Sequence, residues 1–292
     1  MVIHMIKIEQ KDALYPSVLK SIKKSPKQLY LEGNTKLLET PAIAIIGSRT
    51  CTSYGEKMAE KFAQELSQYG LTIISGMAKG IDSIAHKASL EVKGNTIAVL
   101  PCGLNKIYPK KNIGLYKRII ENDGLVLTEY EPDAEASSEK FLERNIIINT
   151  LSIGILVIEG GHRSGTSFTA HNAMKADKKV FCIPSSLENP KGITPNKLIQ
   201  EGAMLVTNVE DIICEYKELN LKKHITSKTE LINELESDED NEVLKILRKE
   251  THINEIAKKL KLSISETNSK LMLLELEDKV IALPGNYYKR KT

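Results

Sequence analysis

A short polar turn follows the first strongly apolar run of this sequence. Gly47, Ser48 and Arg49 come directly after AIAII at 42–46. Glycine lets the backbone approach a ligand closely, and a serine hydroxyl and the following amides donate hydrogen bonds to anions. An arginine guanidinium binds a phosphate through two parallel hydrogen bonds. The turn therefore predicts phosphate binding, with an ordinary tight turn and a surface arginine as the open alternative.

A second candidate loop, SGMAKGID at 75–82, follows the next apolar run. Gly76 and Gly80 flank Lys79 just before a predicted helix, an arrangement that suits an anion-binding loop. An ordinary turn in which Asp82 caps the helix explains the same residues. Both interpretations stay open from the sequence.

The third candidate loop, GGHRSGTS at 160–167, imitates an ATP-binding loop. Gly160 and Gly165 have the spacing of a Walker A motif, but Thr166 stands where that motif requires lysine. Without the lysine we expect no ATP hydrolysis, whereas backbone amides at a helix N-terminus can still bind a phosphate. The candidate contacts of this loop are Arg163, Ser164, Gly165 and Thr166.

A fourth candidate region lies in a predicted helix. It combines positive charge, an aromatic ring and an amide in Lys140, Phe141, Arg144 and Asn145. A solvated helix face is the alternative interpretation of these charges.

The sequence contains few patterns that are typical of catalytic sites. The sequence contains no GxSxG, no HExxH and no Cys–His pair with recognisable spacing. His86 and His171 lie on predicted helices, where we expect them to pack. We therefore predict a protein that is not an enzyme and has no catalytic residues, no metal and no cofactor.

The elements that position these loops alternate between β-rich and amphipathic helical runs. The β-rich runs occupy 42–46, 71–75, 96–100, 125–129, 155–159 and 179–183. Several of them are apolar on both faces, as buried parallel strands are. The pattern predicts a doubly wound, mainly parallel α/β sheet, in which ligands bind beyond the carboxyl ends of the strands.

The composition indicates a soluble protein with more than one folded part. The chain has 292 residues, 41% of them hydrophobic and 27% charged, with a formal net charge of +3. Its N-terminus lacks the apolar core of a signal peptide, and its longest apolar stretch is too short to span a bilayer. We therefore expect a cytoplasmic protein that does not contact membranes.

The domain boundaries follow from shifts in charge and pattern. We expect an N-terminal extension that packs on the core at 1–41, a ligand-binding α/β domain at 42–217 and an acidic linker at 218–240. Residues 241–292 contain three helical runs and two short β-rich runs around Pro284 and Gly285, which predicts a winged helix-turn-helix.

Taken together, the loops resemble the DprA/Smf family of bacterial DNA-processing proteins. The matching stretches cover about residues 15–215 and are YPSVL, IIGSRT, YGEKMAEKFAQEL, SGMAKGIDSIAHKASL, TIAVLPCGLNKIYP, EYEP, FLERNIIIN, VIEGGHRSGTSFTAHNA and NKLIQEGA. The resemblance implies an extended Rossmann domain that binds single-stranded DNA, forms a homodimer and helps to load the RecA recombinase during natural transformation. The C-terminal winged helix resembles the one that many members carry.

The resemblance also assigns residues to the site. They are Ser48 and Arg49 in the phosphate-binding turn, Gly76 and Lys79 in the second loop, Phe141, Arg144 and Asn145 in the FxxRN segment, and Ser164, Gly165 and Thr166 in the SGT loop. Phe141 offers a surface on which an unpaired base can stack.

The sequence departs from the family at two points. Members often begin with a small helical domain before YPSVL, whereas about fourteen residues precede it here, so we do not expect the functions of that domain. The usual Pro-Gly after the late strand reads Pro184-Ser185, and the usual Arg-Asn-Arg reads Arg144-Asn145-Ile146. We therefore expect one basic contact fewer.

Two other functions are compatible with the same fold. The GG-x-x-SGT loop is also similar to the PGGxGTxxE loop of the phosphoribohydrolases of the lysine-decarboxylase-like group. Here Glu159 replaces the proline and Thr169 stands in place of the catalytic glutamate, which disfavours hydrolysis. A nucleotide-sensing module without DNA binding is the other alternative. The winged helix is compatible with DNA binding, protein binding or regulation.

Overall fold

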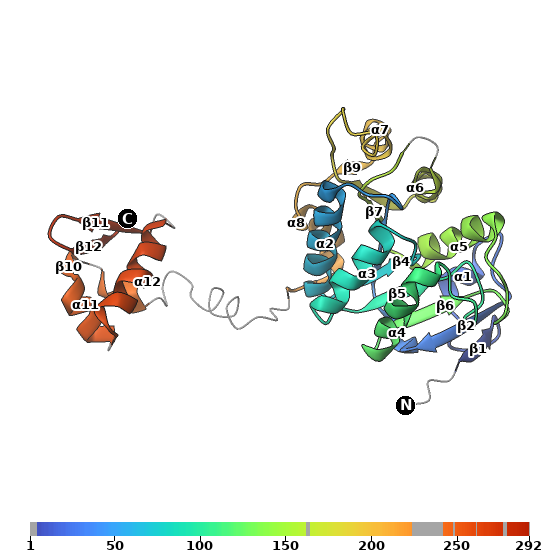
Figure 1. Cartoon of the computed structure of the whole chain (residues 1–292), viewed down its shortest axis with the longest axis horizontal. Coiled ribbons are helices and arrows are strands. Elements are labelled where there is room, and N and C mark those ends of the chain that lie inside the picture. The colour runs from blue at the N-terminus through green and yellow to red at the C-terminus, as the bar shows by residue number, and fades with distance from the viewer. Residues whose placement is uncertain are drawn as a thin grey trace. The chain divides into compact units, whose positions relative to one another are not determined.

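The chain forms two compact units, Met1–His224 and Ile225–Thr292, in a computed structural model (Figure 1). The structure describes residues 5–161, 164–223, 242–247, 249–260, 262–276 and 279–291. The described hydrophobic clusters of each unit consist of residues of that unit alone. Most of the predicted acidic linker lies outside the described residues, because 224–241 are not described.

The larger unit is built on a nine-stranded sheet. In sheet order its strands are β1 (Ile6–Glu9), β2 (Gln28–Gly33), β6 (Leu125–Thr128), β5 (Thr96–Val99), β4 (Thr72–Ser75), β3 (Ala42–Ile46), β7 (Gly154–Val157), β8 (Lys179–Cys182) and β9 (Met204–Leu205). All pairs from β6 to β9 are parallel. The prediction of a doubly wound, mainly parallel sheet is therefore confirmed.

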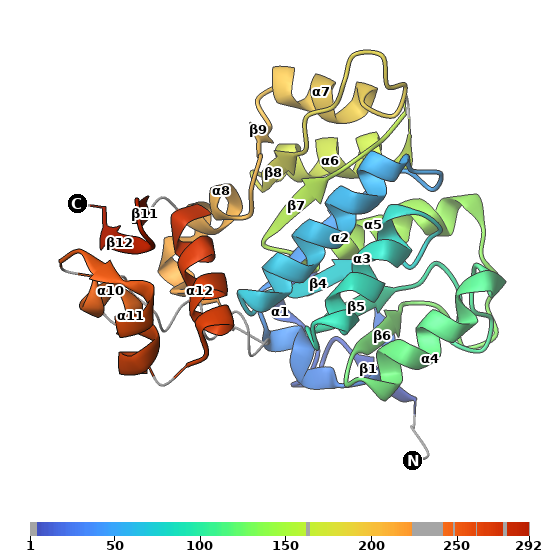
Figure 2. The same cartoon turned by 60° about the vertical axis from the view of Figure 1, so that its left-hand side comes forward.

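Helices cover both faces of this sheet (Figures 1 and 2). They are α1 (Ser17–Lys20), α2 (Ser53–Gln68), α3 (Ile81–Glu91), α4 (Ile113–Glu121), α5 (Ser138–Leu151), α6 (Gly165–Lys175), α7 (Ile193–Gln200) and α8 (Glu210–Ile213), with shorter helices η1 (Thr35–Glu39), η2 (Lys110–Asn112) and η3 (Cys214–Leu219). None of the helices in the described part of the chain is long and apolar enough to cross a membrane.

The alternation of side chains along β3 explains the two layers. Ala44 and Ile46 belong to the buried cluster that contains residues of α5 and α6, whereas Ile43 and Ile45 belong to the cluster of α2 and α3. Successive side chains of a strand point to opposite faces, so a strand covered on both sides must be apolar throughout. The run AIAII meets this requirement.

The sheet order places a topological switch point between β3 and β7. The chain proceeds from β3 to β4, β5 and β6 in one direction and then returns to β7 on the other side of β3. The loops after β3 and β7 therefore diverge to opposite faces and leave a crevice beyond the carboxyl ends of these strands. This is the position at which the predicted glycine-rich loops meet.

The N-terminal extension is part of the same sheet. β1 pairs with β2, and β2 pairs with β6, both antiparallel. No strands were expected in this segment from the sequence. In β1 the charged residues Lys7 and Glu9 alternate with isoleucines, and two antiparallel strands at a sheet edge lack the continuous apolar run of the central strands.

The smaller unit is a winged helix-turn-helix, as predicted. Its elements are α10 (Glu242–Ile246), β10 (Thr251–His252), α11 (Ile253–Leu260), α12 (Ile264–Leu276), β11 (Val280–Leu283) and β12 (Tyr287–Arg290), with sheet order β10-β12-β11. Before α12, the Ser263 hydroxyl accepts a hydrogen bond from the Glu266 amide, while the Glu266 carboxylate accepts one from the Ser263 amide. This reciprocal pair is the capping box that fixes the start of α12.

Candidate functional site

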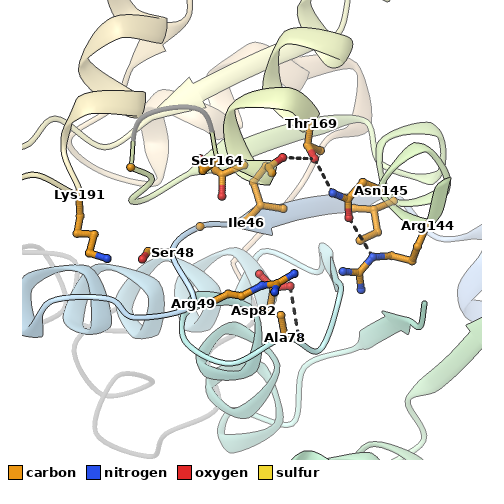
Figure 3. Close-up of a pocket in the computed structure, with 15 residues that line it drawn as sticks. Ile46, Ser48, Arg49, Ala78, Asp82, Arg144, Asn145, Ser164, Thr169 and Lys191 are labelled. Carbon is orange, nitrogen blue, oxygen red and sulfur yellow. Dashed lines mark hydrogen bonds between the residues drawn. The ribbon is translucent and has the colours of Figure 1, made fainter. Parts of the chain in front are cut away.

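A cavity of about 460 Å³ opens at the switch point (Figure 3). Its walls come from the loops after β3 and β7, from the starts of α3 and α6, and from α5. Three cationic side chains, Arg49, Arg144 and Lys191, and one carboxylate, Asp82, line it. In Figure 3 the Lys191 and Arg144 side chains enter from opposite sides.

Arg144 forms the buried part of this cavity and is only 3% exposed. Its Nη1 donates hydrogen bonds to the carbonyl oxygens of Gly76 and Val99, the latter at 2.6 Å, and its Nε donates to Asn145 Oδ1 at 2.9 Å. Burial lowers the pKa of Arg144 to about 10, so the guanidinium stays charged at neutral pH. The side chain therefore supplies fixed positive charge, held by the carboxyl ends of β4 and β5.

The packing of Arg144 explains why position 76 is a glycine. A Cβ placed on Gly76 would lie 2.0 Å from Nη1 of Arg144 and 2.3 Å from its Cζ. Only a residue without a side chain lets the guanidinium pack this closely against the backbone. The predicted ligand contact of Gly76 remains a prediction, and the structure gives this glycine a structural role.

Asp82 is the only carboxylate among the cavity-lining residues of the described chain and is 8% exposed. Its Oδ2 accepts a long hydrogen bond, 3.4 Å, from the amide of Ala78. Burial raises the pKa of Asp82, although the positive charges of Arg144 and Arg49 and the backbone amides of Ala78 and Gly76 oppose the rise. Two amides of the Gly76–Lys79 loop thus face a carboxylate of the protein itself, which leaves this loop less suited to bind an external anion.

The loop after β3 is held by Glu159, a fully buried carboxylate. Glu159 accepts hydrogen bonds from the amide and the hydroxyl of Thr52, at 2.9 and 2.5 Å, and from Asn189 at 3.3 Å. Thr52 in turn caps the N-terminus of α2. The N-terminal end of α2 is therefore occupied by an internal anion, which is favourable at that end of a helix.

The N-terminus of α6, by contrast, faces the cavity. Gly165 and Thr166 form its first turn and line the cavity, and Ser164 caps it by accepting a hydrogen bond from the Ser167 amide at 3.3 Å. Thr169 ties this turn to α5, because its hydroxyl donates to the Gly165 carbonyl and accepts from the Asn145 side chain at 2.9 Å. Free amides and the helix dipole make such an end a binding site for anions.

Arg49 and Lys191 supply the accessible positive charge. The Arg49 guanidinium is exposed and lies over the ring of Phe141, with its Cζ 4.7 Å from the ring centroid. Lys191 Nζ donates to the hydroxyl of Thr50 at 2.7 Å. In Figure 3 the Arg49 side chain points across the cavity toward Arg144, so two guanidinium groups converge on one space.

The structure brings eight of the thirteen predicted residues to this cavity: Gly47, Ser48, Arg49, Arg144, Asn145, Ser164, Gly165 and Thr166. Four others, Gly76, Lys79, Lys140 and Phe141, do not line it. Lys140 donates instead to the Glu135 carbonyl at 2.6 Å and lies over the Tyr130 ring. Arg163 lies outside the described residues.

Sequence reasoning missed Lys191 and the role of Asp82. Lys191 follows Pro190 in a loop with no recognised motif, and only the tertiary fold brings it to Thr50. One of the two interpretations of this loop had Asp82 capping α3, but the N-cap of α3 is Gly80, without a side-chain cap hydrogen bond. The juxtaposition of Asp82 with Arg144, which is 62 positions later, leaves no trace in local spacing.

Comparison with known proteins identifies the family. The family model for DNA recombination-mediator protein A matches residues 6–217, and that for the DprA winged helix domain matches residues 228–286. The chain belongs to the DNA recombination-mediator protein A family. Its members are DNA-processing proteins, so the resemblance drawn from the motifs is confirmed.

Individual relatives agree with this assignment. The chain is 34% identical to protein Smf of Escherichia coli over 94% of its own length and 75% of the relative. It is 43% identical to the DNA processing protein DprA of Streptococcus pneumoniae over 70% of this chain and 72% of the relative. The solved structure of the pneumococcal protein superposes with a TM-score of 0.69 and 41% identity, covering 72% of this chain and 74% of that one.

A second solved structure is the DNA processing protein A of Helicobacter pylori. It superposes with a TM-score of 0.65 at 34% identity and covers 75% of this chain and 99% of that one. The description of that structure concerns the single-stranded DNA binding mode of the H. pylori protein.

The contact between Gly76 and Arg144 generates a stability prediction. We expect Gly76→Ala to lower the free energy of unfolding of the larger unit by about 1–3 kcal/mol, the usual cost of forcing atoms into a packed site. Urea denaturation followed by circular dichroism measures this change. The matched control is Gly114→Ala in the exposed first turn of α4, where a new Cβ has no atom within 4 Å. Equal stability of the two variants would show that Arg144 does not constrain position 76.

Proposed function

We propose that the cavity at the switch point binds the phosphate backbone of single-stranded DNA. The observation that carries the proposal is the convergence of two guanidinium groups, one ammonium and the N-terminus of α6 on one cavity. Cationic side chains and helix N-termini are the groups that bind phosphates. Several of them along one sheet edge suit a chain of phosphates better than a single nucleotide.

The single-stranded form of the ligand is supported by the relatives and by the shape of the site. The description of the H. pylori structure concerns the single-stranded DNA binding mode of that protein. The cavity is a recess between loops and helices, and none of its described lining residues forms a protruding helix of the kind that enters a major groove. Contacts to phosphates carry no sequence information, so we expect binding without marked sequence preference.

For the biological role, we propose DNA processing during natural transformation, in which the protein protects incoming strands and loads RecA on them. The family name, recombination mediator, supports this role. We further propose that the protein acts as a homodimer in the cytoplasm. Analytical ultracentrifugation with and without RecA and oligo-dT tests both associations.

We also propose that the protein is a binding protein and not an enzyme. Thr169 stands where the phosphoribohydrolases carry their catalytic glutamate. Its hydroxyl is engaged in hydrogen bonds with Gly165 and Asn145. Glu159 is fully buried and engaged with Thr52 and Asn189. Neither side chain is available as a general base toward a ligand in the cavity.

The exposed Arg49 allows the site to be tested with a single substitution. We expect Arg49→Ala to weaken binding of oligo-dT roughly ten- to a hundredfold, the size of a charge-assisted contact of about 1.5–3 kcal/mol. Arg49→Lys restores binding only in part, because an ammonium cannot form two parallel hydrogen bonds. Fluorescence anisotropy with labelled oligo-dT measures the affinities.

The salt dependence provides an internal check on this variant. The slope of log affinity against log salt should shrink by about one phosphate contact in Arg49→Ala. Thermal melts serve as the folding control, since an exposed guanidinium contributes little to the core. If Arg49→Ala binds as tightly as the wild type, the cavity is not the DNA site.

A second prediction concerns turnover. We expect no release of phosphate from ATP, with or without DNA, and no release of free base from nucleoside monophosphates. Thr166 stands where ATP-binding loops carry lysine, and Thr169 stands where the hydrolases carry glutamate. Malachite-green and chromatographic assays measure both products. Turnover that disappears in Thr169→Ala would make the protein a hydrolase.

A third prediction concerns pH. A phosphate in the cavity lies beside Asp82, whose pKa burial already raises, and the added negative charge disfavours its ionised form further. DNA binding is therefore coupled to proton uptake at Asp82, and affinity should rise as pH falls toward the raised pKa of this carboxyl group. The neighbouring Arg144 stays charged, and His86, whose pKa burial lowers to about 3, stays neutral.

The variant Asp82→Asn removes the titrating carboxylate. We expect it to bind oligo-dT several-fold more tightly at neutral pH, with an affinity that depends less on pH than that of the wild type. Asp177→Asn is the matched control, because it removes an exposed carboxylate just after the C-terminal end of α6. A pH profile that is the same in the wild type and Asp82→Asn would exclude Asp82 as the coupled group.

A further inference from the structure

Tyr108 is an exposed aromatic residue that contacts a ring next to the cavity. Its side chain is 45% exposed, and its ring meets the ring of Phe141 edge-on, with centroids 5.6 Å apart and an interplanar angle of 75°. The ring of Phe141 also contacts the Arg49 guanidinium, whose Cζ lies 4.7 Å from the same centroid. Tyr108 and the exposed Arg49 therefore both contact the ring of Phe141.

The segment that carries Tyr108 is firmly anchored. The Lys106 amide donates a hydrogen bond to the Gly103 carbonyl at 2.9 Å, and the Asn112 amide donates to the Pro109 carbonyl at 2.8 Å. The preceding Ile107 packs against a buried cluster, and the Asn112 side chain donates to the Met77 carbonyl at 2.8 Å. An aromatic ring on an anchored backbone loses little conformational entropy when a ligand stacks on it.

Phe141 is less suited to receive a base than the sequence suggested. It is half-buried, and the guanidinium of Arg49 lies over it while that of Arg144 lies 5.9 Å from its centroid. These contacts make Phe141 a positioning residue that holds Arg49 and Tyr108. The more exposed ring of the pair belongs to Tyr108.

We propose that Tyr108 stacks on an unpaired nucleobase of the strand whose phosphate Arg49 binds. The inference rests on the proposed single-stranded DNA binding and adds the group that selects single strands. Backbone contacts form with any DNA, whereas the faces of bases in a duplex are covered by their neighbours. Only an unpaired base can present its face to Tyr108, and each base–aromatic stack strengthens binding appreciably.

The test compares two ligands with the same phosphates. One is oligo-dT, and the other is a strand of equal length in which every base is replaced by an abasic spacer. We expect Tyr108→Ala to weaken oligo-dT binding about tenfold, within the range for loss of one stacked base, and to leave the abasic strand unaffected. Tyr108→Phe should bind both strands as the wild type does. Arg49→Ala should weaken both.

A fluorescence measurement distinguishes stacking from an indirect structural role. The sequence contains no tryptophan, so Tyr108→Trp introduces a single indole at this position. We expect saturating oligo-dT to quench its fluorescence and to shield it from acrylamide. The abasic strand at saturation should do neither. Thermal melts of all variants confirm folding.

The outcomes separate this inference from the proposed function. If Tyr108→Ala binds oligo-dT like the wild type while Arg49→Ala does not, Tyr108 holds no base and the phosphate site stands. An indole at position 108 that oligo-dT leaves unquenched overturns the inference in the same way. Wild-type protein that binds neither strand overturns the proposed function itself.

Discussion

The buried guanidinium of Arg144 is the interaction on which the rest of the site depends. A buried charge is costly unless it is paired and hydrogen-bonded. Arg144 meets this condition by donating to the carbonyls of Gly76 and Val99 and by lying near Asp82. These contacts explain the glycine at 76 and tie α5 to the carboxyl ends of β4 and β5 through one side chain. Arg144 and Asp82 both line the cavity, so this arrangement forms part of its wall.

The positively charged side chains of the site have two different roles. Arg144 is fixed and nearly inaccessible, so it sets the electrostatic potential of the cavity without rearranging. Arg49 and Lys191 are reached by solvent, and the N-terminus of α6 adds backbone amides. Phe141 links the roles, because its ring contacts both arginines. The internal carboxylates Asp82 and Glu159 occupy the other two loops, which leaves the loop after β7 as the main backbone site for an anion.

Sequence patterns predicted the central fold well and the site in part. Apolar runs such as AIAII predict buried parallel strands, and glycine-rich loops after them predict the switch-point crevice, because both depend on local periodicity. The roles of Gly76, Asp82 and Lys191 were not predictable, since each depends on a partner far away in sequence. The edge strands β1 and β2 were missed because antiparallel edge strands lack the continuous apolar character that marked the others.

Hydrogen–deuterium exchange of the full chain, with and without saturating oligo-dT, tests the central claim most directly. It reports backbone protection at each loop without altering any residue. If the switch-point cavity binds the strand, exchange slows in the loop at 47–52 and in the first turn of α6. Protection confined to the winged-helix unit, with both of these segments unchanged, would contradict the account.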